Sequence, residues 1–465
     1  MLEFDSHRAL LVDLYELTMA AAYFEQHVDC HATFELFARQ LPPERTFLVA
    51  GGIEDALDYL ADLQFSDEDV SFLRGLPVFR NVSSEFFEYL RKLRFTGDVE
   101  AVEEGTLVFA EEPLLQVTAP ILAAQIAETY LLSVINFETL IASKAARVVR
   151  AARGRAVLEF GTRRAQGPEA GVRAARAAYL GGCVATSNVL AGFRYGIPLA
   201  GTAAHSWTQA FATERQSFQA LLDTFPDDAV LLIDTYDPVV GAETAATLGR
   251  KIAGVRIDSG DPLEKSRRVR EILDRHGLRE TKIVASGDLN EYKVEALLSQ
   301  GAPIDIFGVG TDLATSRDVP ALSVVYKLVQ TEHHGQVDYK TKFSEEKVYM
   351  PGRKQVFRFS VGAQYHHDLI AGSAEEPSGG TPLLHPVMRH GQRLRSRPRL
   401  QDARTNVLAD LGRLPEPYHA LRGAPTYPVA KSESLQRLLE EVREQTFGIL
   451  QPAEAMRKKS AVGQR

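Results

Sequence analysis

Short apolar runs and longer amphipathic stretches alternate along the chain from about residue 155 to residue 329. The apolar runs are rich in β-branched residues and predict strands at 156–159, 198–200, 230–233, 254–257, 282–285, 305–307 and 323–328. Between them, apolar residues recur at helical spacing, which predicts helices at 168–179, 188–195, 208–222, 242–252, 263–276 and 291–299. Because strands that alternate with helices form parallel sheets, we predict a block of at least six βα units.

Capping residues mark two helix starts in this block. Ser187 is expected to cap the helix that ends at Tyr195. At Asp261-Pro262-Leu263-Glu264, an acidic N-cap precedes a proline at the first helical position and a glutamate at capping-box spacing. This pattern predicts a helix over Leu263–His276, which Gly277 ends.

The flanking regions indicate further domains, as expected for 465 residues. Residues 122–150 contain neither glycine nor proline and predict one long helix, and residues 342–360 predict a hairpin that turns at Met350-Pro351-Gly352. We predict a sandwich-like α/β domain at 1–119 and an α/β barrel that holds the site at 120–329. A C-terminal region, 330–465, is expected to return in part to the sandwich.

Polar and glycine-rich clusters follow the predicted strands of the block. They are Glu159–Arg164, Gly201–Ser206, Asp234–Asp237, Arg256–Asp261, Ser286–Asp288 and Gly308–Thr311. In α/β barrels, active sites are built from the loops at the carboxyl ends of the strands. We therefore predict an irregular α/β barrel whose loops converge on one mouth, flanked by the sandwich-like domain.

The cluster after the 254–257 strand suits a phosphorylated sugar. Arg256 can bind a pyrophosphate with its guanidinium fork, and Asp258 can accept hydrogen bonds from ribose hydroxyls. Ser259-Gly260 lead into a well-capped helix, whose N-terminus attracts anions. Taken alone, this cluster could equally be a turn and a cap.

Two other clusters can also be interpreted either as functional or as purely structural. In Gly308-Val-Gly310-Thr311, backbone N–H groups can approach a phosphate closely, and Arg317 adds positive charge. For Asp234 and Asp237, capping of the following helix competes with a catalytic role. Recurrence of such clusters at six strand ends favours function.

Charge and cysteine content narrow the possible functions. A formal charge of -8 provides no basic field, so no nucleic-acid partner is expected. Cys30 and Cys183 lie far apart with no CxxC motif, which fits neither a disulfide framework nor a zinc cluster. Without a signal peptide or an apolar run of the ~18 residues that a membrane span needs, we expect a cytoplasmic protein with no membrane partner.

Several motifs occur together in one order. They are Asp13-Leu-Tyr15-Glu-Leu-Thr-Met, Phe160-Gly-Thr-Arg163-Arg, Gly201-Thr-Ala-Ala-His205-Ser, Arg256-Ile-Asp258-Ser-Gly260-Asp, Phe307-Gly-Val-Gly310-Thr and Pro351-Gly-Arg-Lys-Gln-Val-Phe-Arg. The set resembles the nicotinate phosphoribosyltransferases. The resemblance spans most of the chain and is least clear beyond about residue 370. It implies an enzyme that makes nicotinate mononucleotide and pyrophosphate from nicotinate and phosphoribosyl pyrophosphate, the first step of NAD salvage from nicotinate.

The resemblance also implies roles for individual residues. The pyridine ring is expected to stack between Phe160 and a Tyr15 supplied by the partner in a homodimer, with Arg163 on the ring's substituent. His205 matches the histidine that ATP phosphorylates in an ATP-coupled, ligase-type reaction, with Asp234 orienting its ring. Sugar, phosphate and pyrophosphate contacts are expected from Arg39, Arg256, Asp258, Ser259, Gly260, Gly287, Gly308, Gly310, Thr311, Arg317 and Lys327. The implied cofactors are ATP and Mg²⁺.

One segment departs from the family pattern. The family often reads Gly-Gly-Phe-Asp-Gly-Thr-Ser-Asn where this chain has Gly181-Gly-Cys-Val-Ala-Thr-Ser-Asn188, without the acid and the third glycine. In nicotinamide-using relatives a carboxylate follows the threonine, whereas Ser187 stands here. Because a hydroxyl can donate to a carboxylate, Ser187 favours nicotinate as a substrate.

Alternatives stay open within and outside this enzyme class. The base could be nicotinamide, or quinolinate, whose second carboxylate Arg164 would suit; the quinolinate enzymes, however, do not use ATP. A non-catalytic metabolite-sensing barrel would keep only the phosphate clefts, and the joint presence of His205, Asp234 and Asp258 argues against it. A metal-dependent barrel hydrolase is disfavoured because no clustered histidine ligands follow any strand.

Overall fold

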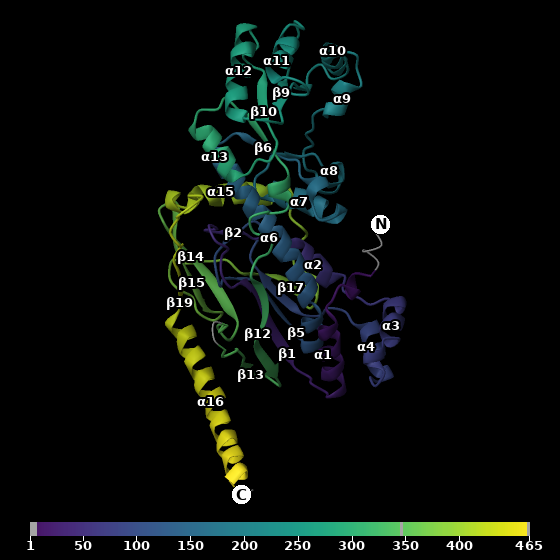
Figure 1. Ribbon diagram of the computed structural model, residues 1–465. Coiled ribbons are helices and arrows are strands. Elements are labelled where there is room, and N and C mark those ends of the chain that lie inside the picture. The colour runs from purple at the N-terminus through teal and green to yellow at the C-terminus, as the bar shows by residue number, and fades with distance from the viewer. Residues whose placement is uncertain (1–6, 345–346, 463–465) are drawn as a thin grey trace.

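The computed structural model describes residues 7–344 and 347–462, and its two parts meet along the long helix α6, Glu128–Ala151 (Figure 1). One part is built on a six-stranded parallel sheet and the other on antiparallel sheets. The parallel sheet curls into a half-barrel, so the predicted α/β barrel class with a flanking sandwich is confirmed.

The half-barrel has the strand order β7-β6-β11-β10-β9-β8. Its strands are β6 (Ala156–Glu159), β7 (Ala185–Thr186), β8 (Val230–Leu232), β9 (Gly254–Ile257), β10 (Lys282–Ala285) and β11 (Ile306–Val309). Its helices are η4 (Thr162–Arg164), α7 (Pro168–Leu180), α8 (Val189–Tyr195), α9 (His205–Gln209), α10 (Glu214–Thr224), α11 (Pro238–Ala246), α12 (Pro262–Arg275), α13 (Glu291–Ser299) and α14 (Thr311–Ala314).

The second part, the sandwich, draws strands from three distant segments of the chain. Its seven-stranded sheet runs β13-β12-β1-β5-β3-β17-β18, a four-stranded sheet runs β16-β14-β15-β19, and β2 pairs with β4. The strands are β1 (His31–Ala38), β2 (Leu48–Val49), β3 (Asp98–Ala101), β4 (Leu107–Val108), β5 (Pro113–Pro120), β12 (Val324–His333), β13 (Gln336–Tyr339), β14 (Lys354–Val361), β15 (Gln364–Gly372), β16 (Thr381–Pro382), β17 (His385–Arg389), β18 (Gln392–Arg393) and β19 (Val429–Lys431).

Helices cover the sandwich and connect it to the half-barrel. They are η2 (Arg8–Leu10), α1 (Leu14–Glu25), α2 (Ile53–Ala61), α3 (Asp67–Arg74), η3 (Pro77–Phe79), α4 (Ser84–Lys92), α5 (Ile121–Ile126), α15 (Leu400–Arg413), η5 (Glu416–His419) and α16 (Glu433–Val462). No helix in the described ranges combines the length and apolar character that a membrane crossing requires.

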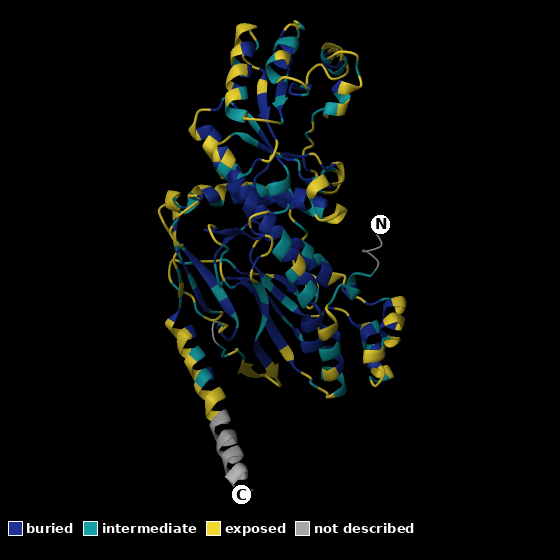
Figure 2. Ribbon diagram, in the orientation of Figure 1, coloured by how far each residue is buried: buried dark blue, intermediate teal, exposed yellow. Residues whose placement is uncertain are grey.

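Helix α6 belongs to both hydrophobic cores. Leu131 and Ile135 in its first half pack in the core of the sandwich. Ala145 and Val148 in its second half pack in the core of the half-barrel. Figure 2 shows the helix as mostly buried where the two parts meet. One continuous helix therefore fixes the half-barrel against the sandwich.

Several predicted elements of the half-barrel are confirmed. Strands β6, β8, β9, β10 and β11 lie where the apolar runs predicted them. Helix α12 begins after Asp261, whose side chain accepts a hydrogen bond from the N–H of Leu263 at 2.9 Å. Asp237 caps α11 by accepting from Val239 and Val240, so its predicted capping role is also confirmed.

Other predictions of elements are wrong, and helix caps explain two of the three differences. The 208–222 helix is two helices, because Thr213 caps a new start at α10 by accepting from Gln216 N–H. The 122–150 helix is broken at Ala127 into α5 and α6. Helix α8 is capped by Asn188 instead of Ser187, since the Asn188 side chain accepts from Ala191 N–H at 2.9 Å.

Two predicted strands and one hairpin also lie elsewhere. The 323–328 run begins β12, which pairs with β1 in the sandwich, so the predicted boundary at residue 329 falls inside a sandwich strand. The 198–200 run makes only an isolated bridge between Leu199 and Thr186. The hairpin joins β14 to β15, because Gly362, with φ 62°, makes the turn that was predicted at Gly352.

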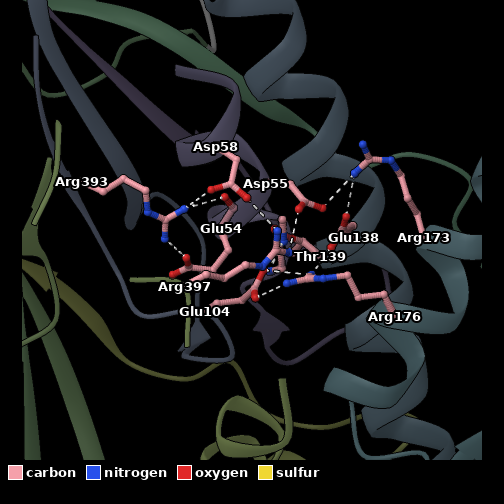
Figure 3. A network of polar contacts seen from close by, with 12 residues as sticks. Glu54, Asp55, Asp58, Glu104, Glu138, Thr139, Arg173, Arg176, Arg393 and Arg397 are labelled. Carbon is pink, nitrogen blue, oxygen red and sulfur yellow. Dashed lines mark hydrogen bonds and ion pairs between the residues drawn. The ribbon is translucent and has the colours of Figure 1, made fainter. Parts of the chain in front are cut away.

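A buried ionic network ties the two parts together beside α6 (Figure 3). Arg176 of α7 donates to Glu104 of the sandwich at 2.5 and 3.1 Å and also to Glu138 of α6. Arg173 donates to both Glu138 and Asp55 at 3.0 Å. The network therefore links α7 of the half-barrel to α2, α6 and the loop before β4.

The C-terminal region closes this network from the other side. Arg393 of β18 pairs with Glu54 and Asp58, and Arg397 reaches Asp55 at 2.7 Å and Asp58 at 2.8 Å. Burial raises the pKa of Glu138 above its usual range. The pKa of Asp55 is low because the nearby arginines outweigh its burial. At both carboxylates the arginine charges therefore act against the effect of burial.

Replacing Arg176 should test how strongly the network stabilises the fold. The Arg176→Leu variant is expected to lose about 3–5 kcal/mol of unfolding free energy, because Glu104 and Glu138 stay buried without that cation. Chemical denaturation measures the loss. As a control, Arg268→Leu removes a pair with Glu264 in which both side chains are 61% exposed, and it should cost less than about 1 kcal/mol. Similar losses in both variants would contradict a structural role for the network.

Candidate active site

The polar loops predicted to converge follow β6, β8, β9, β10 and β11 at the carboxyl edge of the half-barrel sheet. All strand pairs of this sheet are parallel, so these edges coincide. Hydrogen bonds between the loops, described below, confirm that they meet. We call this region the mouth of the half-barrel.

Arg256 links three of the loops at the mouth. Its guanidinium donates to Thr202 Oγ1 at 2.6 Å, to Asp258 Oδ1 at 2.6 Å and to Ser286 Oγ at 2.8 Å. Its Cζ lies 5.9 Å from the centre of the Phe160 ring. The side chain is only 14% exposed. Arg256 is therefore held in one orientation before any substrate binds.

Asp258 stays ionised in this setting. Ser286 Oγ donates to the same Oδ1 atom at 2.5 Å. Burial acts to raise the pKa of Asp258, but the hydrogen bonds from Ser286 and Arg256 and the Arg256 charge outweigh it, so the pKa is lowered. The mouth thus presents a fixed cation beside a fixed anion.

His205 begins α9 and faces this pair. Its Nδ1 lies 3.2 Å from Thr235 Oγ1, and its Nε2 lies 3.9 Å from Asp258 Oδ2. Asp234 is elsewhere: its Oδ2 accepts from the N–H of Asp258 at 2.9 Å and from Ser259 Oγ at 2.7 Å. Among the described contacts, the ring is therefore held by Thr235, not by Asp234 as the resemblance implied. Thr235 lies within the predicted Asp234–Asp237 cluster, although the sequence assigned no role to it.

Asp234 hydrogen-bonds to the loop after β9 through only one of its two carboxylate oxygens. The side chain is buried, and its Oδ1 has no hydrogen-bond partner among the described residues. Nearby, burial and the charges of Asp237 and Asp234 raise the pKa of Glu214 to about 7. Glu214 was also missed; it begins α10, nine residues after His205. This corner of the mouth is therefore acidic and can hold a cation or a proton.

The glycines at the mouth allow close approach between loops. Gly287 has φ 91°, and a Cβ there would lie 2.0 Å from the carbonyl oxygen of Asp258. A Cβ on Gly308 would lie 2.6 Å from the Phe160 ring, and one on Gly310 would lie 3.3 Å from the Phe160 carbonyl oxygen. These contacts explain the glycines by packing; their predicted contact with phosphate stays a prediction.

The remaining predicted residues of the half-barrel lie in the segments that follow β6, β7 and β11, which we call the rim of the mouth. Arg163 of η4 and Ser187 before α8 are exposed, and Thr311 begins α14 directly after Gly310. The Arg317 side chain is 71% exposed and lies 3.6 Å from Asp312. Lys265 of α12, which sequence reasoning missed, donates to the Ser259 carbonyl at 2.7 Å.

Tyr15, Arg39 and Lys327 are not brought to this mouth. Tyr15 lies on α1, Arg39 follows β1 and Lys327 lies on β12. Figure 1 shows these three elements in the sandwich, at the other end of the chain's fold from β9 and β10. Burial lowers the pKa of Lys327, the Glu128 charge opposes this effect, and the nearby Arg39 and Lys342 charges lower the pKa further. Three cations and a carboxylate therefore lie near one another in the sandwich.

The sequence of this chain is similar to that of known proteins over most of its length. Three family models match: the nicotinate phosphoribosyltransferase N-terminal domain at residues 10–136, the nicotinate phosphoribosyltransferase family at 156–345 and the C-terminal domain at 375–439. The chain is 44% identical to nicotinate phosphoribosyltransferase pncB2 of Mycobacterium tuberculosis over 443 residues, 94% of each chain. It is 40% identical to the Bacillus subtilis nicotinate phosphoribosyltransferase, covering 83% of this chain and 82% of that one.

A solved structure agrees with the sequence comparison. The crystal structure of human nicotinic acid phosphoribosyltransferase matches with a TM-score of 0.80 and 29% identity. The match covers 92% of this chain and 99% of that chain. The similarity therefore includes the half-barrel and the sandwich together.

Replacing Gly287 should test the close approach of two mouth loops. Gly287→Ala is expected to lower kcat/KM at least tenfold while the protein stays folded, because the new Cβ would displace the Asp258 backbone. Steady-state kinetics measures kcat/KM, and circular dichroism measures whether the variant is folded. Gly301→Ala is the matched control: Gly301 has φ 73°, but a Cβ there meets nothing within 4 Å. If both variants lose the same activity, backbone strain alone is responsible and the contact is unimportant.

Proposed function

The chain belongs to the nicotinate phosphoribosyltransferase family, and we propose that it joins nicotinate to phosphoribosyl pyrophosphate, yielding nicotinate mononucleotide and pyrophosphate. The observation that carries the proposal is the Arg256–Asp258–Ser286 cluster at the mouth. A guanidinium suits a pyrophosphate, and an ionised carboxylate suits ribose hydroxyls. The product would enter NAD salvage.

The transfer needs no nucleophile from the protein. The pyridine nitrogen attacks C1 of the ribose, pyrophosphate leaves, and positive charge develops on the sugar. Arg256 would hold the pyrophosphate, while Asp258 would hold the ribose and face the developing positive charge. Because both side chains are already fixed by hydrogen bonds, little reorganisation is required.

The acidic corner of the mouth fits Mg²⁺ bound together with the substrate. Mg²⁺ commonly binds through one or two carboxylates plus substrate phosphates. Asp258 and the unpartnered buried Oδ1 of Asp234 are carboxylate oxygens of this kind. These two side chains would hold the ion, which would offset negative charge on the departing pyrophosphate.

We further propose that His205 couples the reaction to ATP as a phosphohistidine. The contact of Nδ1 with Thr235 orients the ring, and the Asp258 carboxylate 3.9 Å from Nε2 would stabilise positive charge on it. His205 would take the γ-phosphoryl group of ATP, releasing ADP, and later pass it to water as phosphate. Its role would be to drive coupling, not to form the bond at C1.

One assay tests the reaction and its coupling. Incubation with phosphoribosyl pyrophosphate, Mg²⁺ and nicotinate should yield nicotinate mononucleotide, and ATP should stimulate it; nicotinamide and quinolinate should give at least tenfold less product. The His205→Ala variant should lose ATP hydrolysis and ATP stimulation while keeping a slow ATP-independent transfer. Product chromatography and phosphate release measure these quantities. If no base yields a mononucleotide, the proposed reaction is wrong; if His205→Ala still hydrolyses ATP, only the coupling is wrong.

The proposal includes a homodimer with shared sites. Tyr15 is 47% exposed on α1, and Arg39, Lys327 and Lys342 gather on the same part of the molecule, far from the mouth of their own chain. On α8, beside the rim of the mouth, apolar side chains are exposed, at 68% for Val189 and 87% for Phe193. A partner's sandwich placed against this rim would cover the apolar side chains and bring in Tyr15.

Mixed dimers test whether sites are shared. Chains carrying Tyr15→Ala and His205→Ala, each with its own affinity tag, should regain about half of wild-type ATP-coupled activity when purified as heterodimers. The reason is that one mouth would then combine an intact His205 with an intact Tyr15 from the partner. Heterodimers no more active than the two parent homodimers would exclude sharing through Tyr15.

A further inference from the structure

Glu159 is a buried carboxylate with only neutral hydrogen-bond donors in its described contacts. It ends β6 and is 1% exposed. Its Oε1 accepts from the N–H of Gly161, and its Oε2 accepts from Thr186 Oγ1 at 2.6 Å. Burial raises its pKa, and these two hydrogen bonds only partly oppose that effect. A buried acid without a cation is costly, so its position calls for an explanation.

The two donors belong to different loops at the mouth. Gly161 lies between Phe160 and Arg163 in the loop after β6. Thr186 ends β7, directly before Ser187. In addition, the backbone oxygen of Glu159 accepts from the N–H of Ser187 at 3.0 Å. One residue therefore joins both loops that the family resemblance assigns to the pyridine ring.

A chain of hydrogen bonds closes this link into a ring. Thr186 Oγ1 accepts from the N–H of Asn188 at 3.0 Å, so its own proton is free to point at Glu159. The Asn188 side chain donates to Thr162 Oγ1 at 3.0 Å, which returns to the loop of Gly161. Hydrogen bonds thus join the two loops, and Glu159 lies at the centre of these contacts.

We propose that Glu159 is the positioning residue of the base subsite and sets the affinity for the pyridine carboxylate. It acts through Gly161 and Thr186, which fix Phe160 and Arg163 relative to Ser187. This inference rests on the proposed function. Glu159 can accept from both neighbours, because a backbone N–H can only donate and the Thr186 hydroxyl, which accepts from Asn188, directs its own proton to Glu159.

The pyrophosphate cluster does not share these hydrogen bonds; Arg256 lies against the Phe160 ring, with its Cζ 5.9 Å from the ring centre. Arg256, Asp258 and Ser286 bond to one another and to Thr202. A substitution at Glu159 should therefore weaken the binding of the base more than the binding of the sugar phosphate. A general loss of structure would affect both substrates alike, so the two KM values separate the explanations.

The Glu159→Gln variant tests the inference. With its amide oxygen on Gly161 N–H, its NH₂ cannot accept from the Thr186 hydroxyl, so that hydrogen bond is removed or reversed at constant size. We expect the KM for nicotinate to rise at least tenfold while the KM for phosphoribosyl pyrophosphate changes less than about twofold. Thr186→Val removes the same link from the other side and should act in the same direction. The double variant should be little worse than either single variant, because one link is broken in all three.

Asp69→Asn is the matched control. Asp69 is a buried carboxylate of α3 that accepts from the N–H of Ser66 at 2.8 Å, away from the mouth. This acid-to-amide change should leave both KM values as in the wild type. An unchanged KM for nicotinate in Glu159→Gln, or an equal rise in both KM values, would overturn the inference. Should Glu159→Gln fail to fold, the same KM comparison in Thr186→Val decides. Absence of nicotinate mononucleotide with the wild type would instead overturn the proposed function.

Discussion

The ion pairs between Arg176 and the carboxylates Glu104 and Glu138 hold the two parts of the molecule together. They join α7 of the half-barrel to the sandwich and to α6, in a region closed to water. Charges buried in this way are stable only while every partner is present. The network therefore favours one relative placement of the two parts and penalises any sliding that would separate its members. The C-terminal arginines reinforce the same placement.

Helix α6 fixes the position of the half-barrel, and therefore of its mouth, relative to the sandwich. Its first half belongs to the sandwich core and its second half to the half-barrel core, so neither part can shift without disturbing both. Lys144 of α6 also pairs with the buried Glu291 of α13 at 2.6 Å and with Asp318 at 2.8 Å. The helix thus packs against the half-barrel and holds in place the strands whose carboxyl-end loops form the mouth. Precise positioning of catalytic groups depends on such support.

The mouth itself is a set of polar side chains that satisfy one another. Arg256 and Asp258 form one unit with Ser286, and Glu159 forms another with Gly161 and Thr186. In the proposed function, the first unit binds the sugar diphosphate and the second positions the residues around the ring of the base. Gly308 lies between the units, because only a residue without a Cβ leaves space for the Phe160 ring. Two substrates can therefore be held side by side by groups fixed in advance.

The sequence by itself determined the local elements of the half-barrel, including β9, β10 and α12, because β-branched runs and capping residues act within a few positions. It also placed the polar clusters at strand ends, since that order is a property of the chain. Tertiary structure alone decided that β12 joins the sandwich, where it pairs with β1. An apolar run of this kind can pair in either sheet, so the sequence does not show which one it joins. Tertiary structure likewise decided that Thr235 contacts His205 while Asp234 holds the next loop, and that Arg176 meets a glutamate 72 residues away. Such pairings depend on the direction of side chains from separately folded elements, which periodicity along one segment does not contain.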